Sequence, residues 1–359
     1  MSLDQTAAGS TASVTPEQEL TPELTRRIAE LLDDAGVQVN RELVRRIVTT
    51  GLLLGTDHTD RLDLKITAAA LDEMREAFQL FEPFESRRMV TVFGSARTKT
   101  DDPLYRQADA VAAALAAEGW MVITGAGPGL MQAAAEGAGP EQSIGVSIRL
   151  PFEEAPSDTL AEPNVVTMKY FFTRKLMLMK ESKGFVSLPG GFGTLDETFE
   201  LLTLQQTGKA EPMPIVLLDA PGGTFWQGLR RYIDEHMVPS GVISPDDFDR
   251  VLVTDSVEAA AAEINGFWRN YNSLRWVGER LVLRLNAAPS DAEIEALNEQ
   301  FGSLLAKGRI ERTTPLRPEV SSDDVLHLPR LVLTLAPRQV GSLYRLIGAV
   351  NALASAPEV

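Results

Sequence analysis

The sequence predicts an α/β fold in which a Rossmann-like parallel sheet carries helices on both faces. Between residues 87 and 270, short and continuously apolar runs alternate with helical stretches of ten or more residues. Glycines cluster where three of these runs end, at the edge where parallel sheets bind ligands. The 359 residues exceed one ordinary core, so smaller parts are expected on either side of this sheet.

The composition is typical of a soluble globular protein, with 44% hydrophobic and 6% aromatic residues. The absence of cysteine excludes disulfides, zinc–thiolate and iron–sulfur sites and a cysteine nucleophile. The three histidines, His58, His236 and His327, lie far apart and do not suggest a metal site. A net charge of −16, from 50 acidic and 34 basic residues, disfavours nucleic acid as a partner.

The N-terminal part is predicted to be a disordered tail followed by helices. Residues 1–20 are small and polar and lack the regions of a secretory signal. Residues 21–86 show apolar residues at helical spacing, which predicts helices within 22–36, 41–55 and 67–81. No apolar run approaches the roughly 18 residues that span a bilayer, so no membrane partner and a cytoplasmic location are expected.

Residues 87–270 are predicted to form the sheet domain, in which strands and helices follow one another in turn. Strands are expected within 89–96, 120–127, 143–151, 164–171, 184–191, 214–220 and 250–255. Helices are expected within 102–119, 129–138, 171–182, 224–238 and 256–268, with a further helix from Thr194. Such an order is that of a doubly covered parallel sheet.

Residues 273–359 are predicted to form a small α+β domain with an antiparallel sheet. The pattern restarts after Asn272 in the order strand, helix, strand, strand, helix. These elements are expected within 279–286, 290–308, 309–316, 327–335 and 338–353. No cluster of chemically active residues marks this part, so regulation, dimerisation and plain packing all stay open as its role.

Two of the glycine-rich loops have a structural and a functional interpretation. Ser95 follows the first strand in "VFGSART", where a simple turn explains it. In "TGAGPGLMQAA", Gly125 and Gly127 allow backbone amides to face an anion at the next helix start. The loop matches neither the dinucleotide fingerprint nor a P-loop. Phosphate binding and a structural turn are therefore equally supported here.

The third loop, "SLPGGFGTLDE", is the most informative of the three. Thr194 and Glu197 fit a helix capping box, which is a purely structural explanation. A capping box does not require Gly190, Gly191 and Gly193 directly at the end of a strand. Three successive loops with such chemistry favour a nucleotide-type site at one edge of the sheet.

A cation is expected near this loop. Arg174 and Lys175 stand near the start of the helix that precedes the third-loop strand, and so near the same edge of the sheet. Arg174 is therefore a candidate to hold a phosphate or ribose. Its alternative role is that of an ordinary surface residue.

These motifs together resemble the Lonely Guy (LOG) family of nucleotide phosphoribohydrolases, whose members are often mislabelled lysine decarboxylases. "PGGFGTLDE" fits P-G-G-x-G-T-x-x-E, and "RK" begins 23 residues ahead of Glu197. The resemblance covers residues 89–267. Two departures from short members are "KYFFTRK", where Met-His is usual before Arg-Lys, and Ala126 in place of a glycine. They bear on base preference more than on the reaction.

The resemblance implies cleavage of the N-glycosidic bond of nucleoside 5′-monophosphates, such as AMP or cytokinin riboside 5′-monophosphates. It implies a Rossmann-like fold, a homodimer or larger assembly, no metal or organic cofactor, and Arg174 and Glu197 as catalytic residues. The expected substrate-binding residues are Ser95, Gly125, Gly127, Lys175, Gly190, Gly191, Gly193, Thr194 and Thr203.

Three rival functions remain at this point, and on one of them, an interaction protein whose terminal domains dominate, the sequence is silent. The first is a non-enzymatic carrier of a nucleotide or of the molybdenum cofactor, which gives no reason for Arg174 and Glu197 to occur together. The second is a lysine decarboxylase, which needs a lysine bound to pyridoxal phosphate. Nothing marks Lys175, Lys180 or Lys183 as that lysine.

Overall fold

The structure is a computed structural model that describes residues 20–149, 162–244, 247–248, 250–336 and 340–358. The predicted tail, apart from Leu20, lies outside these residues, as do the last two residues of the strand expected within 143–151. The described residues divide into two compact units, residues 20–73 and residues 74–358, and the division falls inside a helix. The domain boundaries at residues 86 and 270 stay predictions. No described helix is long and apolar enough to cross a bilayer.

The smaller unit is helical, as the sequence predicts. It contains α1 (Pro22–Asp34), α2 (Arg41–Thr56) and the first part of α3 (Arg61–Phe81). Thr21 caps α1 by accepting a hydrogen bond from the amide of Leu24 at 3.3 Å. Arg41 at the start of α2 donates to the carbonyl of Ala29 at 2.6 Å, which ties the first two helices together.

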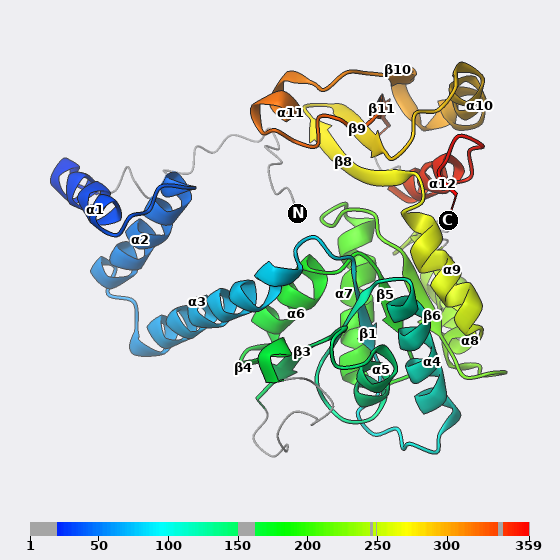
Figure 1. Cartoon of the computed structure of the whole chain (residues 1–359), viewed down its shortest axis with the longest axis horizontal. Helices are drawn as coiled ribbons and strands as arrows, with labels where there is room; N and C mark the ends of the chain where they lie inside the picture. Colours follow the sequence, from blue (N-terminus) through cyan, green and yellow to red (C-terminus); the bar gives the residue numbers. More distant parts are fainter. Residues whose placement is uncertain (1–19, 150–161, 245–246, 249, 337–339, 359) are drawn as a thin grey trace. The chain divides into compact units, whose positions relative to one another are not determined.

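The larger unit is built on a seven-stranded parallel sheet, which confirms the predicted fold class (Figure 1). The strand order is β4-β3-β2-β1-β5-β6-β7. The strands are β1 (Met89–Phe93), β2 (Met121–Thr124), β3 (Ser143–Ile148), β4 (Val165–Met168), β5 (Phe185–Ser187), β6 (Ile215–Leu218) and β7 (Val251–Thr254). The central strands are buried along their whole length, which explains their continuously apolar sequences.

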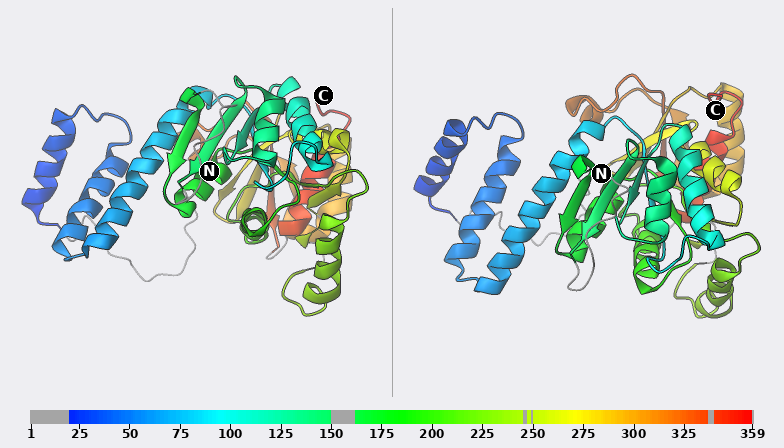
Figure 2. Two further views of the ribbon diagram at one scale, coloured as in Figure 1. Left: turned by 90° about the horizontal axis from the view of Figure 1, so that it is seen from below. Right: turned by 60° about the horizontal axis from the view of Figure 1, so that its bottom comes forward.

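Helices lie on both faces of this sheet (Figure 2). They are α4 (Pro103–Ala117), α5 (Leu130–Ala138), α6 (Phe171–Lys180), α7 (Phe192–Gln206), α8 (Phe225–Tyr232) and α9 (Val257–Phe267). A short π-helical turn, Ile233–Met237, continues α8 to the end of the single helix that was predicted there. The side chain of Asp102 caps α4 by accepting from the amide of Leu104 at 2.8 Å.

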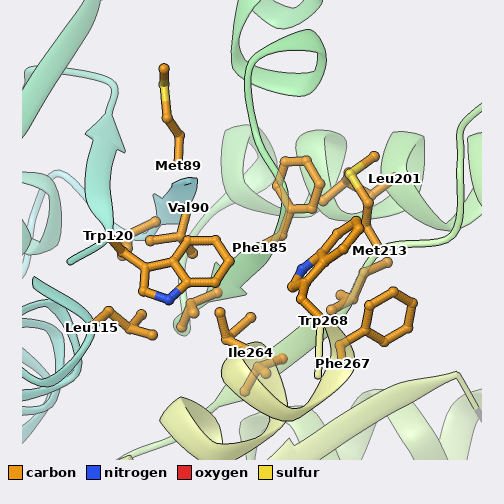
Figure 3. Close-up of a cluster of buried hydrophobic side chains, with 14 of the residues drawn as sticks. Met89, Val90, Leu115, Trp120, Phe185, Leu201, Met213, Ile264, Phe267 and Trp268 are labelled. Atoms are coloured by element: carbon orange, nitrogen blue, oxygen red, sulfur yellow. The ribbon is translucent and has the colours of Figure 1, made fainter. Parts of the chain in front are cut away.

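The core joins the first strand, the fifth strand and the last helix of the sheet. Figure 3 shows Val90, Phe185, Ile264 and the indole rings of Trp120 and Trp268 in one cluster of buried side chains. Both indoles also find hydrogen-bond acceptors. Trp120 Nε1 donates to Asn265 Oδ1 at 2.7 Å, and Trp268 Nε1 donates to the carbonyl of Lys183 at 2.8 Å.

The C-terminal part of the larger unit is a four-stranded antiparallel sheet with helices, which confirms the predicted α+β class. The strand order is β10-β11-β9-β8. The elements are β8 (Tyr271–Val277), β9 (Arg280–Leu285), α10 (Asp291–Phe301), β10 (Leu305–Arg312), α11 (Arg317–Ser321), β11 (Arg330–Leu335) and α12 (Val340–Asn351). Strand β8 and helix α11 were not predicted. Strand β8 lies at the edge of the sheet, where polar and apolar residues mix.

Candidate functional site

The strand order brings the three glycine-rich loops together. Strands β2, β1 and β5 are neighbours in the sheet and all run in the same direction. The segments that follow Thr124, Phe93 and Ser187 therefore leave the same edge side by side. The candidate site is this edge, together with the first turns of α6 and α7.

The first two loops are in direct contact. The amide of Leu130 at the start of α5 donates to the carbonyl of Ser95 at 3.0 Å. Gly129 has a φ of +70°, and a Cβ at this position would lie 2.4 Å from that same carbonyl oxygen. Only glycine fits this close approach. The hydroxyl of Ser95 accepts a hydrogen bond from the amide of Arg97 at 3.1 Å, which is a local turn contact.

Arg174 in the first turn of α6 lies across the end of the second loop. Its Nε donates to the carbonyl of Val146 in β3 at 2.9 Å, and its Nη2 donates to the carbonyl of Gly125 at 3.4 Å. A Cβ on residue 125 would lie only 2.0 Å from Nη2. Gly125 therefore leaves the space that this guanidinium occupies.

Helix α7 begins earlier than its sequence suggests. Gly191 is the N-cap, the first helical residue is Phe192, and no side chain caps the helix. The predicted capping box of Thr194 and Glu197 is therefore wrong, as is the predicted helix start at Thr194. The cause is the packing of Thr194, whose Oγ1 would lie 2.2 Å from a Cβ on Gly190. The missing side chain of Gly190 makes room for Thr194 inside the helix.

Glu197 is buried in the second turn of α7, with 5% of its surface exposed. Burial raises the pKa of the Glu197 carboxyl, and the nearby charges of Arg174 and Lys175 oppose this rise. Arg174 is thus close enough to Glu197 for their charges to interact. The structure brings together the two residues on which the sequence-based hypothesis depends.

Lys175 is engaged with carboxylates of α7. Its Nζ lies 2.6 Å from an oxygen of Asp196 and 2.8 Å from an oxygen of Glu200. Burial alone would lower the pKa of Lys175, but the hydrogen bonds to these two carboxylates raise it. Lys175 therefore ties α6 to α7 within this chain, and its contact with a substrate stays a prediction.

The remaining predicted residues differ in their surroundings. Gly191 and Gly193 are exposed, and a Cβ on either would meet no atom within 4 Å. Gly127 lies against Met131, whose Cε would be 2.6 Å from such a Cβ. Thr203 lies eleven residues beyond the start of α7, about 16 Å along the axis, and donates its hydroxyl to the carbonyl of Phe199 at 2.8 Å. The contact of Thr203 with a substrate therefore stays a prediction.

Sequence reasoning missed several contributors to this edge. The carbonyl of Val146 positions Arg174, and a backbone group leaves no signal in a sequence. Thr198 donates a hydrogen bond to the carbonyl of Thr194 at 2.7 Å and lies 3.1 Å from the hydroxyl of Ser187 at the end of β5. In the sequence, the only indication of a role for Thr198 is that a polar residue stands on the buried face of α7. Among the described residues, no group of three potential ligands is placed to hold a metal ion.

The fold and this edge define a Rossmann-like α/β protein with a candidate catalytic carboxylate and a guanidinium beside glycine-rich loops. A family model described as "Possible lysine decarboxylase" matches residues 129–264. The chain is 32% identical to the cytokinin riboside 5′-monophosphate phosphoribohydrolase of Mycobacterium marinum over 180 residues, or 49% of this chain and 93% of that protein. It is 33% identical to the protein of the same name from Mycobacterium tuberculosis over 169 residues, covering 46% and 87%.

The chain therefore belongs to the LOG family of phosphoribohydrolases. Among solved structures, it is similar to the molybdenum cofactor binding protein of Rippkaea orientalis, with 18% identity and a TM-score of 0.36. That similarity covers 50% of this chain and 96% of the other.

Proposed function

We propose that this protein hydrolyses the N-glycosidic bond of a nucleoside 5′-monophosphate and releases the free base and ribose 5-phosphate. AMP and cytokinin riboside 5′-monophosphate are the proposed substrates. The names of the similar mycobacterial proteins support the second of these substrates. The observation that carries the proposal is the buried carboxylate of Glu197 within electrostatic range of Arg174 at the ligand-binding edge of the sheet.

In this mechanism Glu197 acts on the ribose. Cleavage of a ribosyl C–N bond builds positive charge on the sugar, as glycoside hydrolysis does. A carboxylate stabilises that charge more strongly in a site with little water than in solution. The same group orients the ribose hydroxyls or accepts a proton from the attacking water. The water oxygen then bonds to the anomeric carbon as the base leaves with the bonding electrons.

The phosphate is held by the surrounding residues. Arg174 anchors the 5′-phosphate through its guanidinium, which two backbone carbonyls already position. The exposed backbone at Gly191 and Gly193 forms the N-terminal end of α7, where helix geometry favours an anion. Ser95, Gly125, Gly127, Gly190 and Thr194 complete the proposed binding surface. Binding energy from the phosphate is thereby used to position the sugar over Glu197.

We also propose that the protein forms a homodimer or larger assembly and acts in the cytoplasm. Helices α6 and α7 expose large apolar side chains, which are uncommon on a surface that stays in water. These are Phe171, Phe172, Leu176, Phe192 and Phe199. Light scattering after size exclusion would measure the mass in solution. A monomer at micromolar concentration would contradict the assembly.

The proposal is tested by incubating the full chain with AMP and with cytokinin riboside 5′-monophosphate, followed by chromatography of the base. Glu197→Gln keeps the shape of the side chain but removes its charge. We expect it to lower turnover by about 10²-fold or more, the scale typical of a positioned acid or base. Arg174→Ala should also abolish release of the base.

The matched control is Glu141→Gln, because Glu141 is exposed between α5 and β3. It should leave turnover unchanged, and circular dichroism should show that all three variants fold. Unchanged turnover in Glu197→Gln would contradict the proposed catalytic role of the Glu197 carboxylate. Tight binding of AMP by the unaltered chain without release of adenine would instead indicate a carrier.

A further inference from the structure

Lys175 joins the two helices that carry the proposed catalytic residues. Its Nζ lies 2.6 Å from an oxygen of Asp196 and 2.8 Å from an oxygen of Glu200, so one ammonium of α6 meets two carboxylates of α7. We call these three residues the ion-pair cluster. Arg174 and Glu197 are the direct chain neighbours of Lys175 and Asp196. The cluster and the proposed catalytic residues therefore connect the same two helices next to one another.

The ion-pair cluster is shielded from water on the side of the lysine. Only 15% of the Lys175 side chain is exposed, against 61% for Asp196 and 37% for Glu200. Fully exposed ion pairs hold a structure weakly, whereas a half-buried lysine between two carboxylates has a fixed position. Asp196 and Glu200 stand one turn apart on the same face of α7. Their contacts with Lys175 therefore fix the rotation of α7 as well as its distance from α6.

The rotation of α7 decides where the Glu197 carboxylate points. Successive side chains on a helix point about 100° apart, because one turn takes about 3.6 residues. With Asp196 held toward Lys175, Glu197 points to another side, where it is buried and within electrostatic range of Arg174. If α7 turned or slid along α6, this carboxylate would leave that position. The ion-pair cluster thus controls the geometry of the proposed site.

Lys175 also balances the charge around Glu197. The charged groups that act on Glu197 come from the two helices: Arg174 and Lys175 from α6, and Asp196 from α7. Burial raises the pKa of the Glu197 carboxyl, the two cations oppose this rise, and Asp196 adds to it. Without Lys175, Asp196 and Glu200 would lose their shared cation beside Glu197. The loss would raise the pKa of Glu197 further.

We propose that Lys175 is a positioning residue of the hydrolysis, which holds Glu197 against Arg174 through Asp196 and Glu200 and makes no contact with the substrate. An ammonium has three N–H groups, and two of them are used by these carboxylates. The assignment rests on the proposed function and adds Asp196 and Glu200 to the residues on which turnover depends. It replaces the substrate contact that the family resemblance implies for Lys175.

Steady-state kinetics of the full chain test this assignment, with whichever of the two proposed substrates the unaltered chain turns over faster. Lys175→Met should lower kcat/KM by about 10²-fold, the scale of a misplaced catalytic group. The loss should appear in kcat and not in KM, because other residues bind the substrate. Lys175→Arg keeps the cation between the helices and should recover most of the lost activity.

An exchange of charges separates positioning from contact with the substrate. Lys175→Glu combined with Glu200→Lys reverses the ion pair between the helices and leaves the total charge unchanged. It should be roughly tenfold more active than Lys175→Glu alone, as expected for two directly coupled residues. A lysine that binds the substrate would not be replaced by one on α7.

The pH profile gives a further readout that a purely structural contact would not move. In Lys175→Met, the acidic midpoint of kcat/KM should shift to higher pH, because Glu197 then takes up its proton more readily. In Lys175→Arg it should stay in place. The matched control is Lys209→Met, which removes an exposed lysine just after α7 and should change neither kcat nor the midpoint.

The outcomes separate this assignment from the proposed function. If the unaltered chain releases no base, the proposed hydrolysis fails, and the assignment fails with it. If the unaltered chain is active, the assignment alone is overturned by full activity of Lys175→Met, by a loss in Lys175→Met that lies in KM, or by no recovery on exchange of the charges. Should a Lys175→Glu variant fail to fold, the comparison of Lys175→Met with Lys175→Arg decides.

Discussion

At position 125, the absence of a side chain decides where Arg174 can lie. A methyl group there would occupy the position of the guanidinium, 2.0 Å from Nη2. The guanidinium would have to shift from this position, which disturbs the hydrogen bond of Nη2 to the carbonyl of Gly125. In enzymes, a displacement of about 1 Å at a positioning residue costs up to 10²-fold in rate. The glycine is thus as much a part of the site as the arginine.

We therefore expect Gly125→Ala to lower kcat/KM for AMP by about 10²-fold, while the protein stays folded. Steady-state kinetics and a thermal melt measure the two effects. The control is Gly228→Ala in α8, where a Cβ would meet no atom within 4 Å. Equal activity of Gly125→Ala and Gly228→Ala would show that the position of Arg174 does not matter for turnover.

The buried carboxylate of Glu197 makes activity depend on pH in a defined direction. Its pKa is raised above the ordinary 4.5 by burial. Because the proposed mechanism needs the ionised form, kcat/KM should fall on acidification with a midpoint above pH 4.5. A pH profile between 4 and 8 measures it. A midpoint at or below the ordinary value would contradict the role of Glu197.

The raised pKa of Glu197 also affects the stability of the fold. A salt-bridged acid stabilises the folded state when it ionises, whereas ionisation of Glu197 destabilises it. A raised pKa means that the folded state binds the proton more tightly than the unfolded state, so ionisation of Glu197 destabilises the fold as pH rises through the folded pKa. Glu197→Gln should therefore raise Tm at neutral pH, and the gain should shrink below the folded pKa. Thermal melts of both proteins across pH test this. A gain that grows on acidification would show that the cause is different.

At the scale of elements, the start of α7 was the main error of sequence interpretation. Thr194 and Glu197 match a capping box, yet the helix begins at Phe192 and leaves Glu197 uninvolved in capping. Local pattern could not show that Gly190 makes room for Thr194. The helix start is consequently uncapped by side chains, and its exposed glycines face open space.

We predict that Gly193→Ala weakens substrate binding without lowering stability, as expected if Gly193 serves binding and not folding. Alanine fits this helical position and should stabilise the protein by roughly 0.5–1 kcal/mol. A bound phosphate needs the backbone close by, so KM for AMP should rise about tenfold, as expected when roughly 1.4 kcal/mol of binding is lost. Kinetics and urea denaturation measure the two effects. An unchanged KM would exclude close approach of the substrate at Gly193.

At the scale of the larger unit, the side chain of Asn351 links the C-terminal helix α12 to the segment between the parallel and the antiparallel sheet. From the last residue of α12, its Oδ1 accepts from the amides of Asn270 and Tyr271 at 2.9 and 2.7 Å. Its Nδ2 donates to the carbonyl of Phe267 at 2.6 Å. One side chain thus connects α12 to the end of α9 and to the start of β8.

Asn351→Ala should lower the free energy of unfolding by about 3 kcal/mol, because three buried backbone groups lose their partner. Urea denaturation followed by circular dichroism measures the loss. The control is Asn272→Ala, since Asn272 bonds only to two side chains, donating to Asn286 in an exposed hydrogen bond and accepting from the hydroxyl of Ser273. A loss no larger than that of the control would show that water replaces Asn351 without cost.

The sequence by itself determined the parallel sheet, the order of its strands and helices, and the edge where glycines, Arg174 and Glu197 were expected. These follow from apolar periodicity and from the backbone freedom of glycine, both of which act over a few neighbouring residues. It could not show the contacts between distant residues. Lys175 with Asp196 and Glu200, and Arg174 under the carbonyl of Val146, join segments far apart in the chain. Only packing of the whole unit decides which of these groups meet, because burial and electrostatic coupling depend on every neighbour at once.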